Sequence, residues 1–156
     1  MPSFSSLVLP SLYHATRQAA PRVARSSASF STFSANAMAN KPDLVTFEEL
    51  DERIHKSDKN YVLIDVREPG EVTQGVIPTS HHIPVGTLQE ALTLEAKEFE
   101  ARFGFKKFDK NDEVIFYCRS GRRSGIAFET AKSLGYSSVR NYAGSWIDYE
   151  SKVKGQ

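Results

Sequence analysis

The sequence predicts an α/β fold, an open parallel sheet with helices on both faces. Two apolar runs of strand length, at residues 61–64 and 114–117, are continuous, as is typical of parallel strands that are buried on both sides. Between and after them lie segments in which apolar residues recur at helical spacing. Strands that alternate with helices indicate a parallel sheet, and the chain length predicts one domain, which we place at residues 41–156.

The first helix and the first strand of this domain have local signals. Thr46 and Glu49 have the spacing of a capping box, in which both side chains satisfy free backbone N–H groups at a helix start. The strand at 61–64 ends at Asp65, and Pro69 with the glycine after it predicts a short helical turn. The apolar stripe of the helix consists of Phe47, Leu50 and Ile54.

The middle of the domain is expected to hold a loop and one long helix. Residues 76–84 contain prolines near both ends and predict a short strand and loop. Residues 88–103 predict a single helix, which Gly104 terminates. The helical spacing rests on Leu92, Ala96, Phe99 and Phe103.

The last third of the domain continues the alternation of helices and strands. After the strand at 113–117, apolar residues at helical spacing predict a helix at 124–134, which Gly135 closes. A strand is expected at 138–142, and a last helix that contains Trp146 follows it. The sequence contains no internal repeat.

The first forty residues have the composition of a targeting segment. Residues 1–40 contain no Asp or Glu and many serines, which is typical of a mitochondrial transit peptide. We therefore expect residues 1–37 to be a disordered leader that directs the protein to the mitochondrial matrix, and initiation at Met38 would give a cytosolic form. A tail without function is the alternative. The basic residues of the leader are Arg17, Arg22 and Arg25.

Composition argues against several classes of function. The formal net charge of +1 provides no overall basic field of the kind that nucleic-acid-binding proteins use. No apolar run has the length of a membrane span, so stable membrane insertion is not expected. The one cysteine and four histidines show no spacing typical of a zinc site, so we expect no metal.

The residues with the clearest chemistry follow the strand at 113–117. Ligands of open parallel sheets bind at the carboxyl ends of strands, and a helix start supplies free N–H groups that attract anions. Glycine permits a tight loop there, and three arginines close to the single thiol favour its thiolate form. The expected site is Cys118, Arg119, Ser120, Gly121, Arg122, Arg123 and Ser124. In the alternative interpretation, Cys118 is a small buried apolar residue and the arginines are a solvated surface.

Several segments, in this order and spacing, resemble the rhodanese family over residues 43–153. They are 63–69, 75–84, the loop 118–124, and the closing segments 134–136 and 141–146. Within 75–84 this chain departs from the usual family pattern: Val76, Thr79, Ser80 and His82 stand where the family commonly has His, Gly, Ala and Asn. The resemblance implies a rhodanese-like fold and is strongest to small thiosulfate sulfurtransferases that use a thiol acceptor.

The resemblance also implies the roles of the site residues. Cys118 would be the catalytic sulfur carrier, residues 119–123 would bind the anionic donor, and Asp65 and Ser124 would support the loop. The enzyme would move sulfur from thiosulfate to glutathione, another small thiol, a protein thiol or cyanide, through a persulfide on Cys118. This cycle requires neither a metal nor an organic cofactor.

Two other functions use related features. Cysteine phosphatases place an arginine six positions after the cysteine, whereas that position is Ser124 here and Arg123 comes one residue earlier. The loop is therefore expected to suit sulfur better than phosphate. A non-catalytic protein-binding module of the same fold is the other alternative, and the arginines beside Cys118 argue against it because such a module needs no activated thiol.

Overall fold

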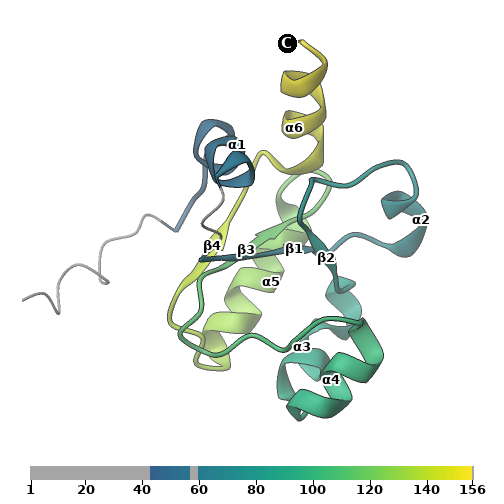
Figure 1. The fold of residues 1–156 in the computed structure, drawn as a ribbon, viewed down its shortest axis with the longest axis vertical. Helices are drawn as coiled ribbons and strands as arrows, with labels where there is room; N and C mark the ends of the chain where they lie inside the picture. Colours follow the sequence, from purple (N-terminus) through teal and green to yellow (C-terminus); the bar gives the residue numbers. More distant parts are fainter. Residues whose placement is uncertain (1–42, 57–59, 156) are drawn as a thin grey trace, which may run out of the picture. The chain divides into compact units, whose positions relative to one another are not determined.

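A parallel sheet of four strands forms the centre of the molecule (Figure 1). The computed structural model describes residues 43–56 and 60–155 of the chain. The strand order is β2-β1-β3-β4, so β1 and β3 are central. Every pairing is parallel, and Asp65 at the end of β1 lies opposite Tyr117 at the end of β3. The strands are β1 (Val62–Asp65), β2 (His81–His82), β3 (Val114–Tyr117) and β4 (Val139–Asn141).

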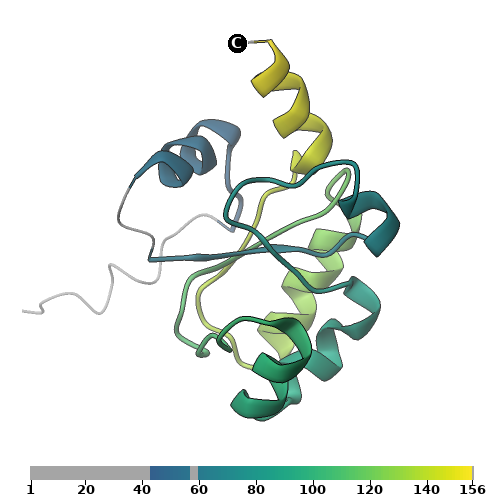
Figure 2. The ribbon, with the colours of Figure 1, turned by 45° about the vertical axis from the view of Figure 1, so that its right-hand side comes forward.

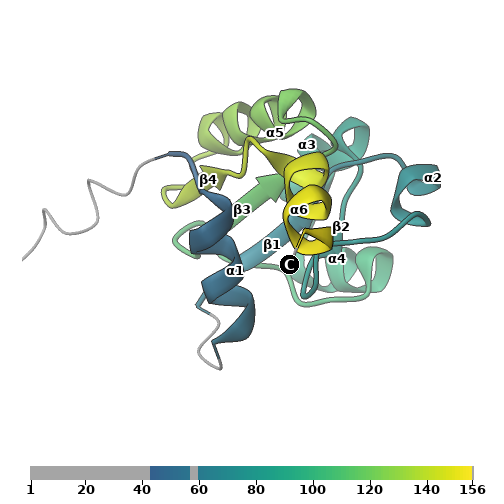
Figure 3. The same ribbon diagram turned by 90° about the horizontal axis from the view of Figure 1, so that it is seen from above.

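Helices cover both faces of the sheet, as the sequence predicts. Leu63 and Ile115 point to one face and join a core with α1 and α6, while Ile64 and Phe116 point to the other and join a core with α3, α4 and α5. Figure 1 shows these two groups of helices above and below the strands, and Figure 3 shows α1 and α6 on the near side of the strands when the sheet is seen from above. The helices are α1 (Phe47–His55), α2 (Pro69–Val72), α3 (Val85–Thr93), α4 (Ala96–Phe103), α5 (Arg122–Ser133) and α6 (Ser145–Lys154).

Only the Thr46 half of the predicted capping box forms. The Thr46 hydroxyl accepts a hydrogen bond from the Glu49 amide at 3.2 Å. The Glu49 carboxylate lies instead between the guanidinium groups of Arg53 and Arg140. Arg140 lies on β4 and is 3% exposed, and a buried charge requires a counter-charge more strongly than a helix start requires a second cap.

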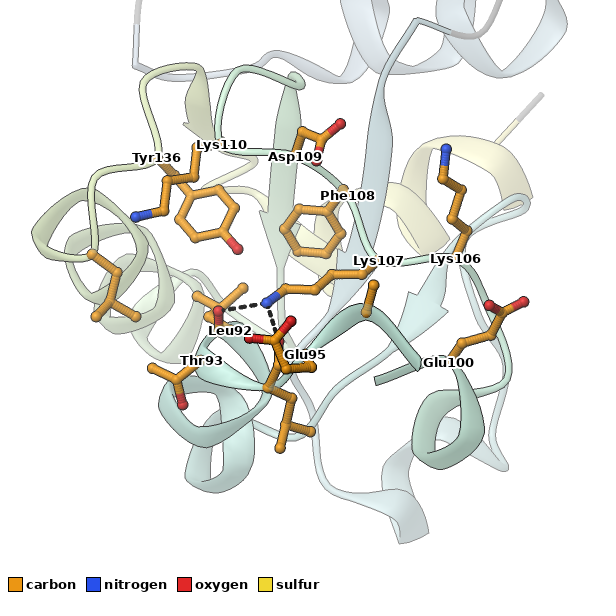
Figure 4. Close-up of a pocket in the computed structure, with 13 residues that line it drawn as sticks. Leu92, Thr93, Glu95, Glu100, Lys106, Lys107, Phe108, Asp109, Lys110 and Tyr136 are labelled. Atoms are coloured by element: carbon orange, nitrogen blue, oxygen red, sulfur yellow. Dashed lines mark hydrogen bonds between the residues drawn. The ribbon is translucent and has the colours of Figure 1, made fainter. Parts of the chain in front are cut away.

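The predicted helix at 88–103 is wrong as a single element, because the chain forms two helices there. Leu94 and Glu95 have extended backbones, with ψ of 151° and 153°, and they separate α3 from α4. The ammonium group of Lys107 donates hydrogen bonds to the carbonyl oxygens of Leu92, at 2.9 Å, and Leu94 (Figure 4). These bonds satisfy carbonyl groups that the end of α3 leaves free.

A cavity lies beside this break and away from Cys118. Its volume is about 760 Å³, and it lies between the α3–α4 junction and residues 106–110 (Figure 4). Residues 106–110 precede β3, whereas Cys118 follows it, so the cavity and the cysteine lie at opposite ends of that strand. None of the helices in the described ranges has the length and apolar character needed to cross a bilayer.

Substituting Phe99 by alanine should destabilise the fold strongly. Phe99 is fully buried on α4, and its ring centroid lies 4.9 Å from that of Phe103 and 5.1 Å from that of Phe105. Removal of such a ring costs about 3–5 kcal/mol of unfolding free energy, because a cavity remains. Urea unfolding followed by circular dichroism measures the loss. Leu44→Ala, at a side chain that is 58% exposed, is the control and should change stability by less than about 0.5 kcal/mol. Equal losses for both variants would contradict the assigned core.

Candidate active site

Cys118 is the first residue after the central strand β3, and α5 begins four residues later at Arg122. The structure therefore brings the predicted loop to the carboxyl edge of the sheet, where α5 presents its N-terminal amides. The cysteine is 1% exposed, so its sulfur lies inside the loop. Figure 2 shows this loop beside the segment that contains α2.

The loop closes around the sulfur through a turn at Gly121. This residue has a φ of 89°, in the left-handed region, and its amide donates a hydrogen bond to Cys118 Sγ at 3.1 Å. A Cβ atom at this position would collide with the carbonyl oxygen of Ala143. Both facts require glycine, which has no side chain and accepts positive φ.

Helix α6 holds the carbonyl groups of the loop. The amide of Trp146 donates to the Cys118 carbonyl oxygen at 2.9 Å, and the amide of Ile147 donates to that of Arg119 at 3.1 Å. With these carbonyl oxygens held by α6, the amides that follow are free to face the interior of the loop. The loop therefore has the polarity of an anion-binding site.

The pKa of Cys118 lies below that of an ordinary cysteine. Burial raises this pKa, but hydrogen bonds from the amide and hydroxyl of Ser124, the Ser120 amide and the Ser145 hydroxyl together lower it more. The sequence analysis predicts that the thiolate form of Cys118 is favoured, but it attributes the lowered pKa to the neighbouring arginines. Hydrogen bonds within the loop and from α6 are the main cause.

The three arginines of the loop have different surroundings. Arg119 and Arg122 are exposed, whereas Arg123 is half-buried and donates two hydrogen bonds to the Glu71 carboxylate, at 2.5 and 2.7 Å. The bonds from Arg123 lower the pKa of Glu71 to about 2, although burial opposes them. Arg123 therefore already has an anionic partner before any donor binds.

Glu71 is a site-neighbouring residue that the sequence analysis misses. It lies in α2, and its carboxylate also accepts a hydrogen bond from the Glu68 amide at 3.1 Å, which completes a capping box. The acidic residue three positions after the N-cap is a signal for that box. Its contact with Arg123 spans 52 positions of sequence and has no local signal.

Asp65 lies at the end of β1 and binds Arg67, not the cysteine loop directly. Both residues are buried, and the Arg67 guanidinium donates to Asp65 Oδ2 at 2.6 and 2.9 Å. Arg67 also donates to the carbonyl oxygens of Glu71, at 3.3 Å, and Gly75, at 2.7 Å. Asp65 thereby holds the α2 segment, and Glu71 connects that segment to Arg123.

Ser124 and Ser145 are buried on either side of the loop. The Ser124 hydroxyl donates to the Gly121 carbonyl oxygen at 3.1 Å, and Ser145 Oγ accepts a hydrogen bond from the Cys118 amide at 3.1 Å. The sequence analysis assigns loop support to Ser124 but gives Ser145 no role. Within the described ranges, no group of three His, Cys, Asp or Glu side chains is arranged to hold a metal ion.

Three residues that depart from the usual family pattern lie in or just before β2. Thr79, where the family commonly has glycine, has a φ of 70°. Ser80 Oγ lies 3.0 Å from the Tyr117 hydroxyl, and His82 Nε2 lies 2.8 Å from the Arg67 carbonyl oxygen. These side chains therefore fix the same segment that Arg67 holds.

Known proteins share this domain and this sequence pattern. The family model described as "Rhodanese-like domain" matches residues 46–152, which lie within the domain predicted at 41–156. Thiosulfate:glutathione sulfurtransferase of Saccharomyces cerevisiae is 42% identical over 106 residues, which cover 68% of this chain and 76% of that protein. Thiosulfate sulfurtransferase RDL2, mitochondrial, of the same yeast is 37% identical over 111 residues, which cover 71% of this chain and 74% of that protein.

A solved structure shows the same similarity in three dimensions. The human single-domain sulfurtransferase TSTD1 matches with a TM-score of 0.68 and 34% sequence identity, over 72% of this chain and 98% of that chain. The family model alone spans more than half of the sequence. The chain belongs to the family of rhodanese-like domains.

Proposed function

We propose that this protein is a thiosulfate sulfurtransferase that passes sulfur to a thiol such as glutathione. The observation that carries the proposal is the buried Cys118 sulfur, which accepts a hydrogen bond from the Gly121 amide at 3.1 Å inside a loop that favours its thiolate. A thiolate is the nucleophilic form of cysteine. Two of its relatives in yeast bear the name of this activity.

The reaction consists of two sulfur transfers. In the first, the Cys118 thiolate attacks the outer sulfur of thiosulfate, a new S–S bond forms, the original S–S bond breaks, and sulfite leaves with the electron pair. In the second, an acceptor thiolate attacks the outer sulfur of the resulting persulfide, and Cys118 leaves as a thiolate. The atoms and electrons balance without a metal or an organic cofactor, and ping-pong kinetics follow.

The loop would bind the charged species of both steps. Its N–H groups and the N-terminus of α5 stabilise the anionic persulfide, as they stabilise the thiolate. Arg119 and Arg122 are exposed and lie one and four positions after Cys118, and they would offset the double negative charge of thiosulfate as it approaches. The charge of Arg123 is paired with that of Glu71, so we assign Arg123 a smaller part in attracting thiosulfate.

The position of Ser124 favours sulfur transfer over phosphate hydrolysis. Ser124 occupies the place of the phosphatase arginine, and its buried hydroxyl donates to Gly121 within the loop. This short loop encloses the sulfur closely, since Gly121 itself bonds to Sγ. A phosphate group would require a wider loop with an arginine at that place.

We also propose mitochondrial localisation. Residues 1–37, the expected leader, lie outside the described residues, so the proposal rests on their acid-free sequence and on the relative whose name includes "mitochondrial". The matrix is the destination that such leaders specify. Initiation at Met38 would add a cytosolic form.

The purified protein should produce sulfite from thiosulfate with glutathione as acceptor, and it should not hydrolyse aryl phosphates above the buffer blank. Insertion of one glycine after Gly121 should lower thiosulfate turnover about a hundredfold, because a displacement of about 1 Å disrupts the geometry of the reaction. Sulfite release and p-nitrophenol release measure the two activities. Hydrolysis of aryl phosphate that disappears in Cys118→Ser would overturn the proposed function in favour of a phosphatase.

Residues 1–40 fused to a fluorescent protein should accumulate in mitochondria, because their arginines and missing acids suit import. Protease protection after rupture of the outer membrane tests for the matrix. A diffuse cytosolic signal would refute the import proposal. In the full-length protein, Met38→Leu should abolish any cytosolic form that arises from internal initiation.

A further inference from the structure

Ser145 combines an unfavourable backbone with a hydroxyl group beside the reactive sulfur. Its φ is 57°, in the region that glycine adopts most easily, and its side chain is fully buried at the start of α6. Residues other than glycine enter this region at an energetic cost. A serine at such a position indicates that its hydroxyl group makes an interaction that glycine could not make.

We propose that Ser145 is a positioning residue for Cys118, and that its hydroxyl holds the cysteine in place and stabilises the negative charge on the sulfur. Ser145 Oγ accepts a hydrogen bond from the Cys118 amide at 3.1 Å. The same oxygen lies 3.8 Å from Cys118 Sγ, as a donor, and 2.9 Å from the Tyr142 carbonyl oxygen. The hydroxyl therefore contacts both the backbone and the side chain of the cysteine.

The single hydroxyl proton of Ser145 has two possible acceptors, the Tyr142 carbonyl oxygen and Cys118 Sγ. A neutral thiol is a weak acceptor, so the proton points to the Tyr142 carbonyl oxygen. A thiolate is a strong acceptor and draws the proton by rotation of the hydroxyl, because hydrogen bonds to charged groups are the stronger ones. This hydroxyl thus favours the ionised cysteine, in agreement with the lowered pKa of Cys118.

Other elements also present polar and charged groups to the sulfur or close to it. The loop and α5 contribute the Gly121 amide, the Ser120 amide, Ser124 and the charge of Arg123. On the side of α2 and β1 lie Glu71, bound to Arg123, and the Asp65–Arg67 pair with His82 at the Arg67 carbonyl. Variants at position 145 retain all of these polar and charged groups. A comparison among those variants therefore isolates the effect of the Ser145 hydroxyl.

The hydroxyl should also accelerate the second sulfur transfer, a consequence that rests on the proposed function. Cys118 is the leaving group when an acceptor thiol attacks the persulfide. A thiol with a lower pKa leaves faster in such an exchange. Ser145 would therefore aid both the formation of the nucleophile and its release.

The test compares Ser145→Ala and Ser145→Gly with the wild-type protein. Both variants lack the hydroxyl, and Ser145→Gly also relieves the backbone strain, so it keeps the test valid even if the alanine variant folds poorly. The pH dependence of alkylation by iodoacetamide reports the thiolate directly, because Cys118 is the only cysteine. In both variants the midpoint should rise by about one pH unit, a tenfold loss of thiolate at a given pH below the midpoint.

Ser137→Ala is the matched control, since Ser137 also bonds to a backbone carbonyl, that of Lys110, but at the opposite end of the sheet. Its midpoint should equal that of the wild type.

A wild-type midpoint in folded Ser145→Gly would overturn the proposal, because backbone strain would then explain any effect of the alanine substitution. Single-turnover transfer from the persulfide to glutathione should slow about threefold in the glycine variant. A shifted midpoint in a protein that never transfers sulfur would support the role of Ser145 while refuting the proposed function.

Discussion

The orientation of the peptide groups between β3 and α5 is the constraint on which the site depends. Amides at the start of α6 bind the carbonyl oxygens of Cys118 and Arg119, and a left-handed Gly121 turns its own amide to the sulfur. A cysteine placed after any buried strand would be a small apolar residue with a raised pKa. Here the hydrogen bonds from the surrounding donors outweigh burial, and the pKa of Cys118 is lowered.

A second set of contacts connects the strand ends to this loop. The buried Asp65–Arg67 pair fixes the α2 segment, and Glu71 on that segment holds Arg123. Removal of one partner of the buried Asp65–Arg67 pair would leave an uncompensated charge, so the position of the α2 segment is expected to depend on both residues. The charge of Arg123 is therefore paired within the framework of the site, whereas Arg119 and Arg122 are exposed.

Local signals account for what the sequence could predict. Continuous apolar runs identify β1 and β3, and the cysteine directly after β3, followed by glycine and a helix, places the predicted site at the carboxyl edge of the sheet. No glycine or proline marks the break at Leu94. A hydrogen bond from Lys107, which lies 13 residues away in the sequence, stabilises the break, so it has no local signal. The partners of Arg123 and Cys118, Glu71 and Ser145, lie 52 and 27 positions distant, so only the folded chain reveals them.

A labelling experiment tests most directly whether Cys118 carries a transferable sulfur. The protein is treated with thiosulfate that contains ³⁵S in the outer position, freed of small molecules, and then mixed with glutathione. One labelled sulfur per chain should be retained and then released as glutathione persulfide, and Cys118→Ser should retain none. Label that glutathione cannot release, or label retained by Cys118→Ser, would contradict a sulfur-carrying role for this cysteine.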